Sequence, residues 1–89
     1  MNKILLITTQ GCAGCRIMER LIGEAINKSS KEIEFHKKDF KEVKPKFLRD
    51  NGIRDYPTTV FIKDDSIRFI YTGTNPMIVI LRWIDVYFK

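Results

Sequence analysis

The chain has 89 residues, of which 44% are apolar and 30% charged, and its formal net charge is +5. A chain of this length builds one compact core, so we expect a single domain over residues 1–89 with no room for accessory modules. No apolar stretch approaches the roughly 20 residues that a membrane-spanning helix needs. The composition therefore predicts a soluble globular protein with no membrane partner.

The positive charge is concentrated in the middle of the chain, where acidic residues alternate with lysines. One interpretation is a patch for acidic partners or nucleic acid. The interpretation we favour is a solvated face, because the neighbouring carboxylates dilute the field over a Debye length. We therefore expect no nucleic-acid partner. The lysines are Lys28, Lys31, Lys37, Lys38, Lys41, Lys44 and Lys46, and the acids are Glu32, Glu34, Asp39 and Glu42.

The first half of the chain predicts a strand, a helix and a second strand. Residues 3–8 contain an apolar run of strand length, which is typical of a central strand covered on both faces. From residue 12 to about residue 28, apolar residues recur at helical spacing opposite charged ones. Residues 33–36 alternate apolar and charged side chains, which indicates a half-buried strand suited to a sheet edge.

The next segments predict a short helix and a β-hairpin. Residues 44–51 carry Pro45 in a first turn and are followed by Gly52, a pattern typical of a short helix. Residues 58–62 and 67–71 are β-branched and aromatic runs joined by a short polar segment, which predicts two antiparallel strands. The first two strands are joined by a crossover helix and should be parallel, so a mixed four-stranded sheet with helices on both faces follows.

The last predicted helix has Pro76 at its first position and Thr74 or Asn75 as its cap. It is apolar on more than one face, so either the domain wraps it or part of it meets a partner. We expect a residual exposed patch around Trp83 or Tyr87. One stripe comprises Met77, Ile80, Leu81, Ile84 and Phe88, and the apolar residues outside it are Ile78, Val79, Trp83, Val86 and Tyr87.

The two cysteines lie close together in the segment Cys12-Ala13-Gly14-Cys15. A bridge between them would constrain the unfolded chain very little, so its value is chemical. Redox chemistry and half of a zinc site are the two interpretations. Zinc needs four ligands, and only His36, which we interpret as a surface residue, and carboxylates remain to complete a site. We therefore favour redox chemistry and predict no bound metal.

The position of each cysteine predicts its role. At a helix N-terminus, Cys12 lies beside unpaired backbone N–H groups and the positive end of the helix dipole, which stabilise a thiolate. Cys12 is therefore the predicted nucleophile. Cys15 falls one turn later on the apolar stripe, so it is the predicted shielded resolver. The small Ala13 and Gly14 let a substrate backbone come close, and Arg16 adds a nearby positive charge that favours the thiolate.

A second feature is Tyr56-Pro57 at the mouth of a predicted strand. Proline is the residue for which a cis peptide costs least, and a cis bond here would expose the Tyr56 backbone for pairing with an extended substrate.

Together these features resemble the thioredoxin and glutaredoxin family. A strand leads into a C-x-x-C helix start, and Gly-Ile-Arg at residues 52–54 leads into Pro-Thr before a hairpin and a last helix. The resemblance covers nearly the whole chain and is sharpest in residues 12–16 and 44–58. It implies an α/β fold, a thioredoxin-like three-layer α/β/α sandwich of order βαβαββα with a mixed four-stranded sheet. It also implies that Tyr56–Pro57 is cis and lies against the Cys12 sulfur.

The chain departs from both branches of the family. Gly11 stands where thioredoxins usually have Trp, and the apolar residues 4–7 stand where they carry a buried Asp. Ala13-Gly14 replaces the Pro-Tyr pair of glutaredoxins, and residues 73–75 replace their Gly-Gly-acid turn. The electron donor, a reductase or glutathione, therefore stays open.

The resemblance implies a cytoplasmic, monomeric thiol-disulfide oxidoreductase that reduces protein disulfides by dithiol exchange. It needs no cofactor beyond its own redox-active Cys12–Cys15 disulfide. The alternative is a thioredoxin-fold binding module whose cysteines are structural or bind zinc. The implied substrate-binding residues are Gly11, Tyr56, Pro57 and Gly73.

Overall fold

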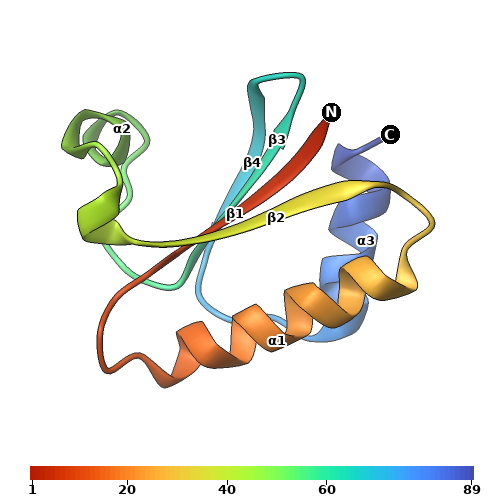
Figure 1. Cartoon of the computed structure of the whole chain (residues 1–89), viewed down its shortest axis with the longest axis horizontal. Coiled ribbons are helices and arrows are strands. Elements are labelled where there is room, and N and C mark those ends of the chain that lie inside the picture. The colour runs from red at the N-terminus through yellow and green to blue at the C-terminus, as the bar shows by residue number, and fades with distance from the viewer.

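The computed structural model describes residues 1–89, and Figure 1 shows its strands as one twisted sheet with helices packed around it. The predicted order of strands and helices is confirmed, with one short 3-10 helix added. The elements are β1 (Asn2–Thr8), α1 (Ala13–Lys28), β2 (Ile33–Asp39), η1 (Phe40–Glu42), α2 (Pro45–Asp50), β3 (Thr58–Lys63), β4 (Ser66–Thr72) and α3 (Met77–Tyr87).

The sheet has the order β2-β1-β3-β4. β1 pairs in parallel with β2 and antiparallel with β3, and β3 pairs antiparallel with β4. The mixed four-stranded sheet is therefore confirmed, with the apolar β1 inside and the half-polar β2 at an edge. Lysine side chains on β2 suit that edge, because charge discourages the pairing of exposed strands between molecules.

The two faces of the sheet carry different layers. Ile4 and Leu6 of β1 belong to the core on the face that α1 and α3 cover, whereas Ile7 belongs to a smaller cluster on the other face. This division follows from the strand period of two residues. The smaller cluster also contains Val60 and packs against Phe47 and Leu48 of α2. Helices on both faces of the sheet are thus confirmed.

Phe61, at the centre of the larger core, is fully buried. Its ring lies 6.0 Å from that of Trp83 and 5.4 Å from that of Phe88, measured between centroids. On β4, Phe69 stacks on Tyr87 at 4.5 Å, with an interplanar angle of 6°. These contacts fasten α3 to the β3–β4 hairpin.

Two expectations for α3 are wrong. The helix begins at Met77 with Pro76 as its N-cap, and neither Thr74 nor Asn75 caps it, because the chain is still extended at Pro76 with ψ of 156°. The expected exposed patch is also misplaced. Trp83 and Tyr87 are half-buried in the aromatic cluster, and the exposed apolar side chains of α3 are Ile78 (72%) and Val86 (53%).

The 3-10 helix η1 was not expected. Asp39 accepts the N–H of Lys41 at 2.9 Å, and Glu42 accepts the N–H of Asp39 at 2.9 Å, so the two acids form a capping box. This turn connects β2 to the segment before α2. None of the helices combines the length and the apolar character that crossing a bilayer requires.

Truncation of Phe61 tests whether the aromatic cluster stabilises the fold. Phe61→Ala should lower the free energy of unfolding by about 3–5 kcal/mol, because it leaves a cavity among several rings. Ile78→Ala, at an exposed position of α3, should change it by less than about 0.5 kcal/mol. Urea unfolding followed by circular dichroism measures both, and equal losses in the two variants would contradict the assignment of the core.

Candidate active site

The predicted redox pair lies at the start of α1, just after the loop that follows β1. A loop passes through Gly11, whose φ of +65° is the left-handed conformation that glycine adopts without strain, and α1 begins at Ala13. Cys12 is the N-cap, and its sulfur accepts a hydrogen bond from the backbone N–H of Cys15 at 3.1 Å. The sulfur therefore satisfies one of the N–H groups that a helix start leaves unpaired.

The structure bonds Cys12 to Cys15 in a disulfide, with the two Cα atoms 5.3 Å apart. The two residues differ in exposure. Cys12 is partly exposed, whereas Cys15 is 5% exposed and lies on the α1 stripe that contains Met18 and Ile22. An incoming group can thus reach Cys12 more readily than Cys15.

Pro57 and the loop before α3 close over the first turn of α1. The Tyr56–Pro57 peptide is cis, in agreement with the family resemblance. A Cβ atom placed on Gly14 would lie 3.4 Å from Cδ of Pro57 and 3.3 Å from Cγ2 of Thr74. The N–H of Gly73 donates to the carbonyl of Pro57 at 2.8 Å. The structure therefore brings Pro57 and residues 73–74 to the cysteine turn. The approach of Thr74 was not predicted from the sequence.

Tyr56 packs on the face of the sheet that α2 covers. Its ring stacks on that of Phe40 from η1, with centroids 5.3 Å apart, and both rings pack on the cluster under α2. Burial raises the pKa of Tyr56, and the negative charges of Asp39 and Asp55 add to the shift. The phenol is therefore neutral over the pH range in which thiols react. η1, which was not expected from the sequence, supplies this support.

Charged side chains line a small hollow beside the disulfide. Its volume is about 140 Å³, and its walls include Arg16 and an ion pair between Lys37 Nζ and Glu19 Oε1 at 3.2 Å. Arg16 is exposed beside the cysteines, as predicted. Lys37 and Glu19 were not predicted to lie at this site. The parallel pairing of Leu6 with Lys37 carries the lysine to this end of the sheet. The remaining lining residues are Thr8, Thr9, Gly11, Cys12 and Cys15.

Thr59 is a further residue that was not predicted from the sequence. Its side chain is fully buried in β3, and its hydroxyl is the one buried side-chain nitrogen or oxygen without a hydrogen-bond partner. A buried hydroxyl left unpaired costs about 1–3 kcal/mol. The only hint in the sequence was a second Thr at the start of a mostly apolar strand. Threonine is common in strands, so this hint does not by itself indicate a functional role.

His36 takes no part in this site. Its Nε2 lies 3.0 Å from Oε1 of Glu34 on the exposed part of β2, and this hydrogen bond lowers the pKa of Glu34. No three His, Cys, Asp or Glu side chains come close enough to hold a metal ion. The zinc alternative therefore lacks the second half of its ligand set in this arrangement.

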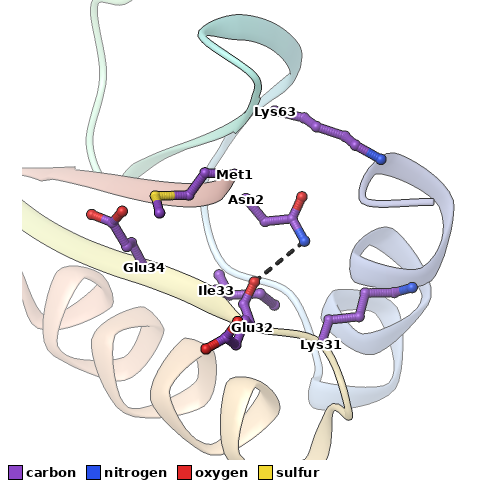
Figure 2. Close-up of a pocket in the computed structure, with 7 residues that line it drawn as sticks. All are labelled: Met1, Asn2, Lys31, Glu32, Ile33, Glu34 and Lys63. Carbon is purple, nitrogen blue, oxygen red and sulfur yellow. Dashed lines mark hydrogen bonds between the residues drawn. The ribbon is translucent and has the colours of Figure 1, made fainter.

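A larger hollow, of about 590 Å³, lies at the other end of the sheet (Figure 2). It adjoins the start of β1, whereas Cys12 follows the end of that strand, so seven residues of extended chain separate the two places. Asn2 bridges the hollow through a 3.3 Å hydrogen bond to the carbonyl of Glu32. Its walls contain no thiol. The lining residues are Met1, Asn2, Lys31, Glu32, Ile33, Glu34 and Lys63.

Comparisons with known proteins agree with this geometry. The family described as thioredoxin matches residues 2–86, so the chain belongs to the thioredoxin family. An Asn-to-Gln mutant of the thioredoxin from Halobacterium salinarum NRC-1 has a similar structure, with a TM-score of 0.81 and 17% sequence identity. The match covers 99% of this chain and 75% of that one, and at this identity it shows the fold alone. No curated protein matches the chain.

Family, fold and the adjacent cysteine pair together indicate a redox function. The family match and the structural match also confirm the predicted thioredoxin-like fold.

Valine substitutions in α1 test the close approach at Gly14. Gly14→Val and Gly23→Val make the same side-chain change within α1, but a Cβ at Gly23 meets no atom within 4 Å. Gly14→Val should therefore unfold with a free energy lower by about 1–3 kcal/mol than Gly23→Val, because it forces Pro57 or Thr74 to move. Chemical denaturation of the oxidised proteins measures the difference, and equal stabilities would mean that the first turn of α1 is not packed against Pro57.

Proposed function

We propose that this protein is a thiol-disulfide oxidoreductase that reduces disulfides in other proteins through dithiol exchange at Cys12 and Cys15. The observation that carries the proposal is the helix cap. The Cys12 sulfur already accepts the Cys15 N–H at 3.1 Å, and the same bond would stabilise a Cys12 thiolate after reduction. The positive end of the α1 dipole acts in the same direction.

The reaction has two steps. The Cys12 thiolate attacks one sulfur of the substrate disulfide, forms a Cys12–substrate disulfide, and displaces the other sulfur as a thiolate that takes up a proton. The Cys15 thiolate then attacks the Cys12 sulfur, which forms the Cys12–Cys15 disulfide and releases the second substrate thiol. Two electrons pass from the protein to the substrate. The greater exposure of Cys12 supports the assignment of the first attack to it.

The backbone of Tyr56 is suited to hold an extended substrate. It takes part in none of the hydrogen bonds between backbone groups outside the helices and strands, although Gly73 already occupies the carbonyl of the next residue, Pro57. A free N–H and a free C=O in one residue can pair with an extended segment as neighbouring strands do. Gly73 lies beside this place, since its N–H donates to the Pro57 carbonyl, and Gly11 lines the hollow beside Cys12. Neither carries a side chain, so both would admit a substrate backbone.

The remaining parts of the proposal concern partners and location. The substrates are disulfide-bonded proteins, and electrons come from a thioredoxin reductase or from glutathione. The protein acts as a monomer in the cytoplasm, where thiols are kept reduced. It needs no metal and no cofactor besides its own cysteines, and its partners do not include nucleic acid or a membrane.

The direct test is the reduction of insulin disulfides with each electron donor supplied in parallel. The wild-type protein should accelerate precipitation of the insulin B chain with one of the two donors. The Cys12→Ser variant is the matched control for the uncatalysed rate. A rate equal to this control with both donors, and with dithiothreitol, would contradict the proposed function.

Single-cysteine variants separate the two steps. Cys15→Ser should accumulate covalent adducts with a disulfide-bonded protein, because attack proceeds and resolution is lost. Cys12→Ser should form none, because its remaining thiol is shielded. Mass spectrometry under non-reducing conditions counts the adducts. Adducts on Cys12→Ser alone would exchange the two roles, and adducts on neither would favour the binding-module alternative.

Arg16 should tune the attacking thiol. Arg16→Gln should slow alkylation of reduced Cys12 at neutral pH by about 1.4-fold to fivefold, because an exposed charge contributes about 0.2–1 kcal/mol. The effect should shrink as salt is added. Arg20→Gln is the matched control, because Arg20 lies one turn further along α1 and pairs with Glu24 at 3.2 Å. An equal effect of both substitutions would assign the change to net charge.

A further inference from the structure

Thr58 and Thr59 are neighbours in β3, and both are fully buried, but their hydroxyls differ. The Thr58 hydroxyl donates to the carbonyl of Asp55 at 2.6 Å and lies 3.0 Å from the hydroxyl of Thr72. The Thr59 hydroxyl has no partner in the oxidised protein. Buried hydroxyls are rarely left unpaired, so the missing hydrogen bond of Thr59 requires an explanation.

The sheet register shows which layer Thr59 faces. Thr59 pairs with Leu6 on one side and with Tyr71 on the other. Leu6 belongs to the core under α1, and the ring of Tyr71 lies 4.8 Å from that of Trp83 in α3. Directly paired residues point to the same face of a sheet. The Thr59 side chain therefore points between the sheet and the layer formed by α1 and α3.

The same space receives Cys15. β1 ends at Thr8 and α1 runs back along the sheet, as Figure 1 shows, so the first turn of α1 lies over the last residues of β1. Cys15 is buried in that turn, one turn before Met18, which packs in the cluster that contains Leu6. The residue before Cys15, Gly14, approaches Pro57, and Thr59 follows Pro57 by two residues. Cys15 in α1 and Thr59 in β3 thus belong to the two layers that face each other here.

We propose that the Thr59 hydroxyl is the hydrogen-bond donor to the Cys15 sulfur in the reduced protein, and that it is left without a partner when the disulfide closes. This inference rests on the proposed redox function of the pair. Breaking the disulfide obliges the two sulfurs to separate. Cys12 is partly exposed and its sulfur caps α1, so we expect it to stay in place while the buried Cys15 sulfur moves inward, toward Thr59.

The hydroxyl acts on the resolving step. Cys15 loses its proton, attacks the Cys12 sulfur of the mixed disulfide and becomes oxidised, while the departing substrate sulfur is reduced and takes up a proton. Thr59 keeps its own proton throughout and donates a hydrogen bond to the thiolate while it exists. A thiolate in an apolar core without such a donor would form less readily.

If Thr59 bonds the Cys15 sulfur only in the reduced protein, two consequences can be measured. The hydroxyl stabilises the reduced protein relative to the oxidised one. Thr59→Val, which keeps the shape and removes the hydroxyl, should raise the equilibrium constant for disulfide formation against dithiothreitol about threefold to tenfold, as expected for one hydrogen bond. A tenfold change corresponds to a potential lower by about 30 mV. In a Cys12→Ser background, Thr59→Val should also raise the pKa of the Cys15 thiol.

The experiment compares the wild-type protein with Thr59→Val, Thr59→Ser and Thr58→Val in a dithiothreitol titration and in thiolate absorbance. Thr59→Ser should restore the wild-type equilibrium, and Thr58→Val should leave it unchanged while lowering stability in both redox states. The proposal is overturned if Thr59→Val matches the wild type, if Thr59→Ser behaves as Thr59→Val, or if Thr58→Val shifts the equilibrium equally. These readouts need no substrate, so failure of insulin reduction by the wild type would contradict the proposed function separately.

Discussion

The hydrogen bond from the Cys15 N–H to the Cys12 sulfur is the interaction on which the site depends. It starts α1 at Ala13, and so sets which residues of the following stripe face the sheet. It also fixes the distance between the cysteines, since a cap residue and the residue three positions later lie on one turn. A serine cap would begin the helix equally well. Unlike a serine oxygen, the Cys12 sulfur can also form a disulfide with Cys15 while it caps the helix.

The rest of the domain holds this turn from two sides. On one face, Phe61 and the rings around it fasten α3, so the loop before α3 brings Thr74 against Gly14. On the other face, the cluster of Ile7, Ile53 and Val60 under α2 supports Tyr56, and with it the entry of β3 at Pro57. The site is therefore a junction of both layers. The sheet places it beyond the end of β1, where loops rather than strands provide the exposed backbone.

Most of the fold could be predicted because local patterns and long-range packing agree along the chain. The period of two in β2, the helical stripe of α1 and the polar turn between β3 and β4 each indicate the element that forms. The start of α3 was misplaced because Thr74 and Asn75 are residue types that often cap helices. In the structure, the loop before α3 instead contacts Gly14 through Thr74 and Pro57 through Gly73. The exposed patch was misplaced because a helical wheel cannot show that the hairpin reaches Trp83 and Tyr87.

The cysteines, Pro57 and Arg16 could be named from the sequence because they lie in short contiguous motifs. Lys37 and Thr59 could not, because each reaches this part of the molecule only through pairing across the sheet. Glu19 lies on α1, and its role was missed because its partner Lys37 comes from β2. That pairing also determines the polarity of the sheet face that α1 covers. Leu6 and Thr59 lie side by side there, so the buried neighbourhood offers a hydroxyl and no carboxylate. A carboxylate titrates and can change its effect on a thiol with pH, whereas a hydroxyl does not ionise in the range of protein function. Any influence of this wall of the site on Cys15 therefore comes from a hydrogen-bonding dipole and not from a group that changes its charge with pH.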